Sequence, residues 1–124
     1  MRLLLDSHVL LWAASDPDRL SPGAKAALER REHELWLSHA SIWELTTRMA
    51  LGRLLPAGAL GDLVHDADTD LLPISLTHIE ATARLPPVHG DPFDRMLIAQ
   101  VIEDGLVLVT ADADIQRHPV SWLR

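Results

Sequence analysis

The sequence predicts an α/β fold, a three-layer α/β/α sandwich with a mostly parallel central sheet. Two observations lead to this prediction. Short apolar runs alternate with segments of helical periodicity along the 124 residues. Turn signals recur throughout, without a low-complexity stretch, a long linker or an internal repeat. A chain of this length buries roughly two thirds of its unfolded surface, so we expect residues 1–124 to form a single domain.

The first half of the chain is expected to hold two strands and three helices. These cover residues 3–5 (strand), 21–31 (helix), 34–37 (strand), 39–51 (helix) and 59–67 (short helix). Ser21-Pro22 has the form of an N-cap followed by proline at the first helical position. Gly52 stands where the left-handed residue that ends a helix is commonly found.

The second half is expected to hold three strands and two helices. These cover residues 70–74 (strand), 77–85 (helix), 91–105 (helix), 106–110 (strand) and 120–123 (strand). Thr77 and Glu80 have capping-box spacing, and Asp91-Pro92 has the form of an N-cap and first helical residue. The run at 106–110 is apolar almost throughout, as in a parallel strand buried on both faces. This alternation of strands and helices favours a mostly parallel sheet that is covered on both sides.

Composition excludes several kinds of site. The chain has no cysteine, so it has neither a disulfide framework nor a thiolate metal site, and any metal must be held by oxygen or imidazole. The apolar run near the N-terminus is broken by Asp6 before a signal-peptide core or a membrane span is complete. We therefore expect a soluble, cytoplasmic protein with no membrane contact.

The net charge is the main objection to a nucleic-acid substrate. The formal charge is −7 at pH 7, whereas proteins that bind phosphates electrostatically usually present a basic face. The objection weakens if several of the acids form one site, because bound divalent ions would neutralise them. All basic residues except Lys25 are arginines, and arginine suits phosphate better than lysine does.

Two acids follow predicted strands, at the sheet edge where sites form in α/β folds. Asp6 comes directly after residues 3–5, and Asp112 stands two residues after Thr110. A carboxylate in such a position often only caps the next helix or turns the chain. Position alone therefore leaves both interpretations open.

Asp94 is more informative because of its place on a predicted helix. Leu97, Ile98 and Val101 follow it at helical spacing, so Asp94 lies on the buried stripe, where an unpaired carboxylate is costly. The alternative is a capping role, since Asp94 is the third residue after Asp91 and the helix dipole favours its charge.

Glu44 and the histidines are less distinctive. The plain interpretation of Glu44 is a surface ion pair with Arg48, one helical turn away. The 7 histidines show no HExxH pattern and no tight ligand spacing, which makes most of them structural or exposed. His8 and His89, each close to one of the acids, are the two that remain of interest.

Four segments, taken together and in order, resemble a known family. They are LLLDSHVLLW at 3–12, LSHASIWEL at 37–45, LPPVHGDPFDRMLIAQ at 85–100 and LVLVTAD at 106–112. This series resembles the successive motifs of the PIN-domain family, in particular the VapC-type toxin ribonucleases of VapBC toxin–antitoxin pairs. The resemblance extends from about residue 2 to about residue 115 and implies a PIN-like fold.

The resemblance also implies a set of catalytic, metal-binding acids, which are Asp6, Glu44, Asp94 and Asp112. Thr110 would take the place of the hydroxyl residue in the last motif. The fourth acid departs from the family pattern, because many relatives have asparagine there followed by Asp-Phe, and Asp114 is an alternative. Asp91 matches a position common in this subgroup, but its spacing suits a helix cap better than a metal ligand.

Such acids suit metal-dependent cleavage of RNA. Convergent carboxylates raise one another's pKa, and a hard divalent cation relieves the repulsion. The resemblance implies an endoribonuclease in which Mg²⁺ or Mn²⁺ generates a hydroxide for in-line attack on a phosphodiester. The alternative is a PIN-fold binding module that has lost catalysis. A phosphoacceptor receiver domain would need a lysine after the last strands, and a haloacid-dehalogenase-like phosphatase would need aspartate in place of His8, so both are set aside.

The resemblance finally implies partners. A VapB-like antitoxin would fold its disordered tail onto the toxin and place a positive side chain near the carboxylates. We also expect a homodimer. Trp12 and Trp43, each close to one of the predicted site residues, belong either to an apolar groove for that tail or to the core.

Overall fold

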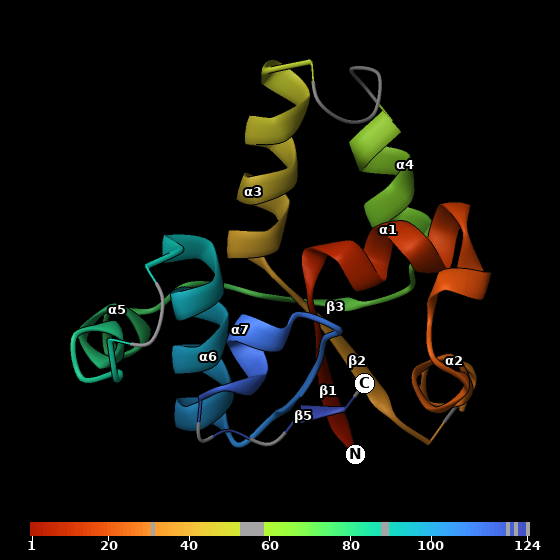
Figure 1. Ribbon diagram of the computed structural model, residues 1–124. Coiled ribbons are helices and arrows are strands. Elements are labelled where there is room, and N and C mark those ends of the chain that lie inside the picture. Colours follow the sequence, from red (N-terminus) through yellow and green to blue (C-terminus); the bar gives the residue numbers. More distant parts are fainter. Residues whose placement is uncertain (31, 53–58, 88–89, 119, 121, 124) are drawn as a thin grey trace.

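The centre of the structure is one parallel sheet of five strands (Figure 1). The computed structural model describes residues 1–30, 32–52, 59–87, 90–118, 120 and 122–123. The strands are β1 (Arg2–Leu5), β2 (Glu34–Ser38), β3 (Asp70–Leu72), β4 (Val107–Val109) and β5 (Trp122–Leu123). Their order across the sheet is β3-β2-β1-β4-β5, and every neighbouring pair is parallel. The predicted α/β fold with a parallel central sheet is confirmed.

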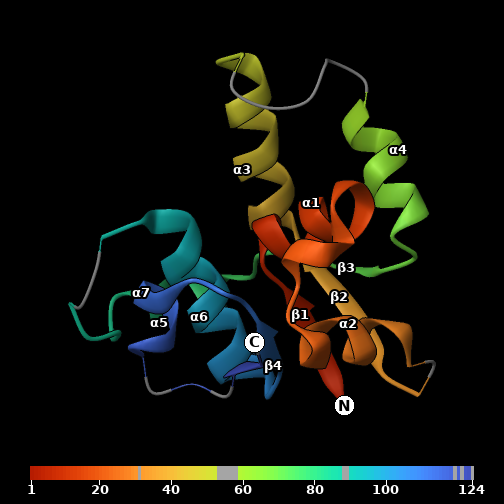
Figure 2. The same cartoon turned by 45° about the vertical axis from the view of Figure 1, so that its right-hand side comes forward.

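Helices cover both faces of this sheet, which makes three layers (Figure 2). One side carries α1 (Ser7–Ser15), a 3₁₀ helix at Pro17–Arg19, α2 (Pro22–Glu29) and α4 (Ala59–Asp66). The other side carries α5 (Leu76–Thr82), α6 (Pro92–Asp104) and α7 (Ala113–Gln116). Helix α3 (His39–Ala50) rises from the end of β2 and packs against both α1 and α6. No helix among the described residues has the length and apolar character needed to cross a membrane.

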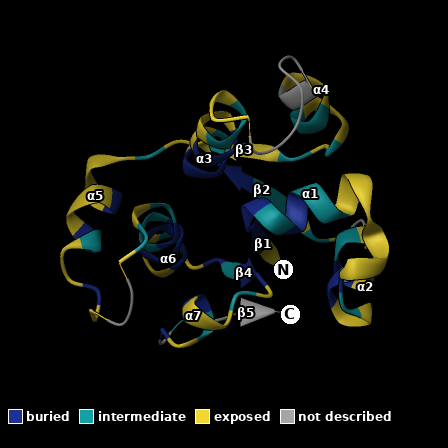
Figure 3. Ribbon diagram, turned by 45° about the horizontal axis from the view of Figure 1, so that its top comes forward, coloured by how far each residue is buried: buried dark blue, intermediate teal, exposed yellow. Residues whose placement is uncertain are grey.

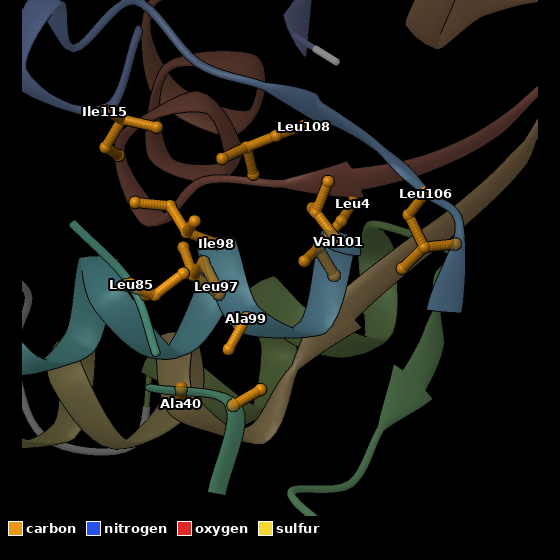
Figure 4. Close-up of a cluster of buried hydrophobic side chains, with 11 residues drawn as sticks. Leu4, Ala40, Leu85, Leu97, Ile98, Ala99, Val101, Leu106, Leu108 and Ile115 are labelled. Carbon is orange, nitrogen blue, oxygen red and sulfur yellow. The ribbon is translucent and has the colours of Figure 1, made fainter. Parts of the chain in front are cut away.

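Alternate side chains of the central strands enter two apolar clusters, as the two-residue period of a strand requires. Leu3 and Leu5 pack with α1 and α2, whereas Leu4 and Leu108 pack with α6. Figure 4 shows the second cluster, in which Leu4 and Leu108 meet Leu97, Ile98 and Val101 of α6. Figure 3 shows how buried residues gather along the central strands and the helix faces turned towards them. The sheet is therefore a rigid base for anything held at its edge.

Several helix ends follow the sequence analysis. The Ser21 hydroxyl accepts the Ala24 N–H at 3.1 Å, with proline at the first helical position of α2. Asp91 caps α6 in the predicted way. Gly52 and Gly105 take left-handed conformations, with φ of 69° and 66°, just after α3 and α6. The predictions of these helix starts and stops are confirmed, although α2 ends earlier than expected.

Other local predictions were wrong. Helix α1 and the short α7 were not expected, and β3 ends before Pro73, which has no N–H to donate to a neighbouring strand. The capping box of α5 begins two residues before Thr77. Ser75 is the N-cap, its hydroxyl accepts the His78 N–H at 3.2 Å, and its own N–H donates to His78 Nδ1 at 3.0 Å. The histidine ring takes the role that the usual pattern gives to Glu or Gln.

Because all five strands are parallel, their carboxyl ends lie at one edge of the sheet. From β1 the chain moves outwards to β2 and β3, and it then returns to the other side of β1 for β4 and β5. The order therefore reverses between β1 and β4, which is where open α/β sheets form their sites. The residues just beyond these two strands begin with Asp6 and Thr110.

Candidate active site

Asp6 lies at the end of β1 and is tied to the end of β4. Its N–H donates to the Val109 carbonyl at 3.1 Å, and its Oδ2 accepts the Thr110 hydroxyl at 2.8 Å. The same Thr110 oxygen accepts the Asp112 N–H at 3.1 Å. Asp6 occupies the N-cap position of α1, yet its side chain makes no capping hydrogen bond. The carboxylate, which is only 3% exposed, is thus turned to the site instead of serving its own helix.

Glu44 reaches the same region from α3. Its Oε1 accepts the Ser7 hydroxyl at 2.6 Å, and its Oε2 accepts Arg48 Nη2 at 3.2 Å. The expected ion pair with Arg48 is present, but the surface interpretation was wrong because Glu44 is only 5% exposed. Sequence reasoning did not assign a role to Ser7. The available signal was its place directly after Asp6.

The start of α6 contributes two further acids. Asp91 Oδ1 accepts the N–H groups of Phe93 and Asp94 at 2.9 and 3.1 Å, as an N-cap should. Asp94 lies on the buried side of the helix, as the spacing predicted. One carboxylate oxygen from each of Glu44, Asp91 and Asp94 lies within 4.8 Å of the others. Asp91, for which the sequence favoured a cap alone, is therefore both a cap and a neighbour of the other acids.

The electrostatics show that the other acids act on Asp94. The pKa of Asp94 is raised to about 8, first by burial and then by the negative charges of Asp91, Asp6, Asp112 and Glu44. Burial also raises the pKa of Asp6, with a further contribution from Glu44, against the opposing effects of the Thr110 hydrogen bond and of His8. The structure thus brings the four acids selected from the sequence, together with Asp91, into one electrostatic environment.

The two aspartates after β4 differ in their surroundings. Asp112 is half-buried and caps α7, with its Oδ1 accepting the Asp114 N–H at 2.8 Å. Its charge is one of those that raise the pKa of Asp94. Asp114 is exposed, and its carboxylate lies 3.4 Å from Arg117. The surroundings favour Asp112 over Asp114 as the fourth acid of the cluster.

The two tryptophans singled out from the sequence also differ in their surroundings. Trp12 is half-buried, with the His8 ring 5.9 Å away and the Arg19 guanidinium 4.7 Å from its ring centroid. Trp43 is 63% exposed, so it does not belong to the core. His89 lies outside the described residues.

The donor set fits a hard divalent cation. Carboxylate oxygens are the ligands that Mg²⁺ and Mn²⁺ prefer, and here they come from separate elements that the fold holds in place. Burial, and after it the charges of the neighbouring acids, raise the pKa of Asp94, so the ionised form of this carboxyl is disfavoured by repulsion as well as by burial. A cation at this position would relieve that repulsion.

Comparison with known proteins identifies the family. The family model described as PIN domain matches residues 3–120. Ribonuclease VapC22 of Mycobacterium tuberculosis is 34% identical over 119 residues, which cover 94% of this chain and 91% of that protein. The chain therefore belongs to the PIN-domain family. Its resemblance to the VapC-type members, first noted from four motifs, extends over nearly the whole chain.

Solved structures show the same fold. VapBC2 from Rickettsia felis, bound to a DNA fragment from its promoter, has a TM-score of 0.77 at 13% identity and covers 99% of this chain and 98% of its own. DNA-bound VapBC from Salmonella typhimurium has a TM-score of 0.69 at 15% identity, with coverages of 99% and 97%. A toxin–antitoxin complex from Klebsiella pneumoniae has a TM-score of 0.68 at 18% identity, with coverages of 98% and 96%.

Proposed function

We propose that the protein is a metal-dependent endoribonuclease that cleaves RNA phosphodiester bonds and acts as the toxin of a type II toxin–antitoxin pair. The observation that supports this most directly is the burial of Asp6, Glu44 and Asp94 together at the point where the strand order reverses. Like charges that are buried together destabilise the folded protein unless a bound ligand offsets their repulsion. A PIN-fold binding module without catalysis, the alternative, would gain nothing from keeping them.

In this proposal the acids are ligands and the hydroxyl groups orient them. Mg²⁺ or Mn²⁺ would be held by Asp6, Asp94, Glu44 and Asp112. When bound, such an ion lowers the pKa of a water and stabilises negative charge on the phosphate and the leaving oxygen. The Thr110 hydroxyl fixes the Asp6 carboxylate and favours its ionised form, and Ser7 with Arg48 fixes both oxygens of Glu44. The chain therefore supplies orientation and negative charge, and no side chain has to act as the nucleophile.

The likeness to toxin–antitoxin structures extends the proposal to partners. The similar solved structures are described as VapBC or toxin–antitoxin complexes, and we propose a VapB-like antitoxin for this chain. A positive side chain on its tail would offset the negative charge that Asp91, Asp6, Asp112 and Glu44 place around Asp94. A chain with a net charge of −7 is suited to such a tail. The homodimer and the cytoplasmic location stay predictions.

The direct test is cleavage of a structured RNA by the purified protein. We expect cutting with Mg²⁺ or Mn²⁺ and none with EDTA. Asp112→Asn should lose most of the activity, whereas Asp114→Asn should keep it because Asp114 is exposed and paired with Arg117. Asp18→Asn, at a fully solvated acid, controls for a change of net charge. Equal cleavage with and without EDTA would overturn the metal assignment, and no cleavage under either condition would overturn the endoribonuclease.

A further inference from the structure

An apolar cavity opens beside the acidic site. Its volume is about 410 Å³, and it lies between α3, the start of α6 and the residues Ile74 and Thr82, which stand just before α5 and at its end. Its lining includes Ala40, Trp43, Ile74, Pro92, Phe93 and Met96. Two of these residues are neighbours in sequence of the buried acids, since Trp43 precedes Glu44 and Phe93 precedes Asp94. Both features bridge the same two helices, because the Trp43 and Phe93 rings meet between α3 and α6, as do the carboxylates of Glu44 and Asp94. The cavity therefore lies next to the acids.

Two aromatic rings form one wall of this cavity. Trp43 and Phe93 pack edge to face, with ring centroids 5.1 Å apart and an interplanar angle of 74°. Trp43 nevertheless stays 63% exposed. Most of the indole surface is thus left for contact with a ligand, and exposed apolar surface next to a site usually marks a place where a ligand binds. Phe93 holds the indole in position without covering it.

Arg95, a basic residue at this cavity, already makes hydrogen bonds within the protein. Arg95 lines the cavity, but its guanidinium donates to the carbonyls of Thr82 and Pro86 at 2.9 and 3.0 Å. It thus fixes the segment between α5 and α6 and helps to shape the wall. What the cavity offers a ligand is therefore mainly an aromatic, uncharged surface.

We propose that Trp43, supported by Phe93, is a stacking platform for an unpaired base of the RNA substrate next to the scissile phosphate. This inference rests on the proposed function. A net charge of −7 gives the chain as a whole no electrostatic attraction for phosphates, and base stacking supplies affinity that does not depend on charge. The platform adjoins the acids at which the phosphodiester would be cut. It therefore selects single-stranded or looped RNA, whose bases are free to leave the helix stack.

The first experiment measures binding without cleavage. A labelled single-stranded RNA is titrated with the protein in EDTA at low salt, and its fluorescence anisotropy gives the Kd. Trp43→Ala should weaken binding about tenfold, the order of one lost base stack. Trp43→Phe should restore most of the affinity because it keeps an aromatic face. Ile102→Ala, which removes an apolar side chain that is 47% exposed near the other end of α6, is the matched control and should bind like the wild type.

The second experiment locates the stacked base by cleavage in Mn²⁺. Trp43→Ala should raise KM about tenfold with little change in kcat, since it removes binding shared by substrate and transition state. An abasic nucleotide at one position beside the cut should have the same effect on the wild type. On that abasic substrate Trp43→Ala should cause no further loss, because the base that it would have contacted is already missing.

The outcomes separate this inference from the proposed function. If the wild type cleaves RNA and Trp43→Ala binds and cleaves it normally, the platform is wrong and the ribonuclease stands. If the wild type does not cleave RNA but Trp43→Ala still weakens RNA binding, the platform stands and the ribonuclease is wrong. If RNA binding is unchanged while Trp43→Ala disrupts a complex with a VapB-like tail or a homodimer, the cavity is a protein-binding surface and the inference is overturned.

Discussion

Helix α6 carries a buried polar cluster near each of its ends, and the two clusters are built in opposite ways. At its start, Asp94 lies among Asp91, Asp6, Asp112 and Glu44, all of the same charge. Burial, followed by the charges of these acids, raises the pKa of Asp94 to about 8, so the protein holds a proton on this carboxyl near neutral pH. Folding alone does not explain an acid at this position, because an apolar residue on the buried side of α6 would cost less free energy.

At the other end, the charged and ring groups are paired, although the buried Gln100 Oε1 accepts no hydrogen bond from the described residues. His78 is 4% exposed, and its Nδ1 accepts the Ser75 N–H at 3.0 Å. The ring hydrogen must then be on Nε2, which donates to Asp104 Oδ2 at 3.0 Å. Gln100 Nε2 lies 3.4 Å from the same Nδ1. This cluster joins α5 to α6 and serves the fold.

The difference between the two ends separates stability from function within one helix. A matched cluster stabilises the protein as it stands, whereas a cluster of like charges is stabilised only when a cation binds it. Removing a member of the first should therefore destabilise the protein. Removing a member of the second should leave the metal-free protein equally stable or more stable, at the expense of activity.

Asp94→Asn should give the largest effect. It removes a ligand and should lower the cleavage rate by at least about a hundredfold, since even residues behind the ligands of a metal commonly contribute 10–100-fold. In EDTA its thermal midpoint should be equal to or above that of the wild type, because the amide relieves repulsion. A capping role for Asp94 predicts the reverse, a modest loss of stability with normal catalysis. An active Asp94→Asn enzyme would contradict the metal assignment.

His78→Ala should have the next largest effect, on stability. It leaves the Ser75 N–H and the Asp104 carboxylate without their partner and should lower the free energy of unfolding by about 2 kcal/mol. Urea titration measures the loss. Cleavage by the folded fraction should be normal, because this cluster is at the far end of α6 from the acids. The control is His65→Ala, at an exposed position of α4, which should change stability by no more than about 0.5 kcal/mol.

The pH dependence of stability should distinguish the acidic end of α6. The pKa of Asp94 is raised from 3.8 to about 8 on folding, so the folded protein holds its proton more tightly than the unfolded chain. The stabilisation is complete below the unfolded pKa and is lost as pH rises through the folded pKa. In EDTA the thermal midpoint of the wild type should therefore drop between pH 4 and pH 8 relative to that of Asp94→Asn. Parallel curves for the two proteins would show that Asp94 is not perturbed.

Sequence patterns predicted the helices whose apolar residues lie on one face or whose ends carry a clear capping residue. Helix α6 shows both, with Asp91-Pro92 at its start, a buried stripe and Gly105 at its end. Helix α1 shows neither, because Val9 and Leu10 pack into two different apolar clusters and leave little polar face. Asp6 is of a residue type common at N-caps, but its carboxylate accepts the Thr110 hydroxyl and makes no capping hydrogen bond.

The site residues follow the same logic. Asp94 was visible from the sequence as a carboxylate on an apolar stripe, and Asp6 as an acid after a strand. Glu44 was not, because its spacing to Arg48 indicates a surface pair until the packing of α3 against α1 buries it beside Ser7. That packing depends on contacts between distant parts of the chain, which local patterns do not report. The family resemblance supplied what periodicity did not.

Asp91 offers the finest test of the comparison, because it belongs to the like-charged cluster and also caps the helix. Its Oδ1 already accepts two backbone N–H groups, so we expect its main contribution to be the cap. Asp91→Ala should lower the free energy of unfolding by about 1 kcal/mol, and Asp91→Ser should restore most of it, because serine is also a good N-cap.

Both Asp91 variants remove the charge that contributes most, after burial, to the raised pKa of Asp94. The loss of stability with rising pH should therefore be smaller in both than in the wild type, while RNA cleavage in Mn²⁺ by the folded protein stays within a few-fold. The pair separates the two roles of this carboxylate: Ala loses cap and charge, and Ser loses the charge alone. If Asp91→Ser is as stable as the wild type but as inactive as Asp94→Asn, Asp91 is a metal ligand in its own right. The four acids indicated by the sequence would then lack one ligand, Asp91. The capping hydrogen bonds, which suggested a purely structural role for Asp91, would also hold its carboxylate in position for the ion.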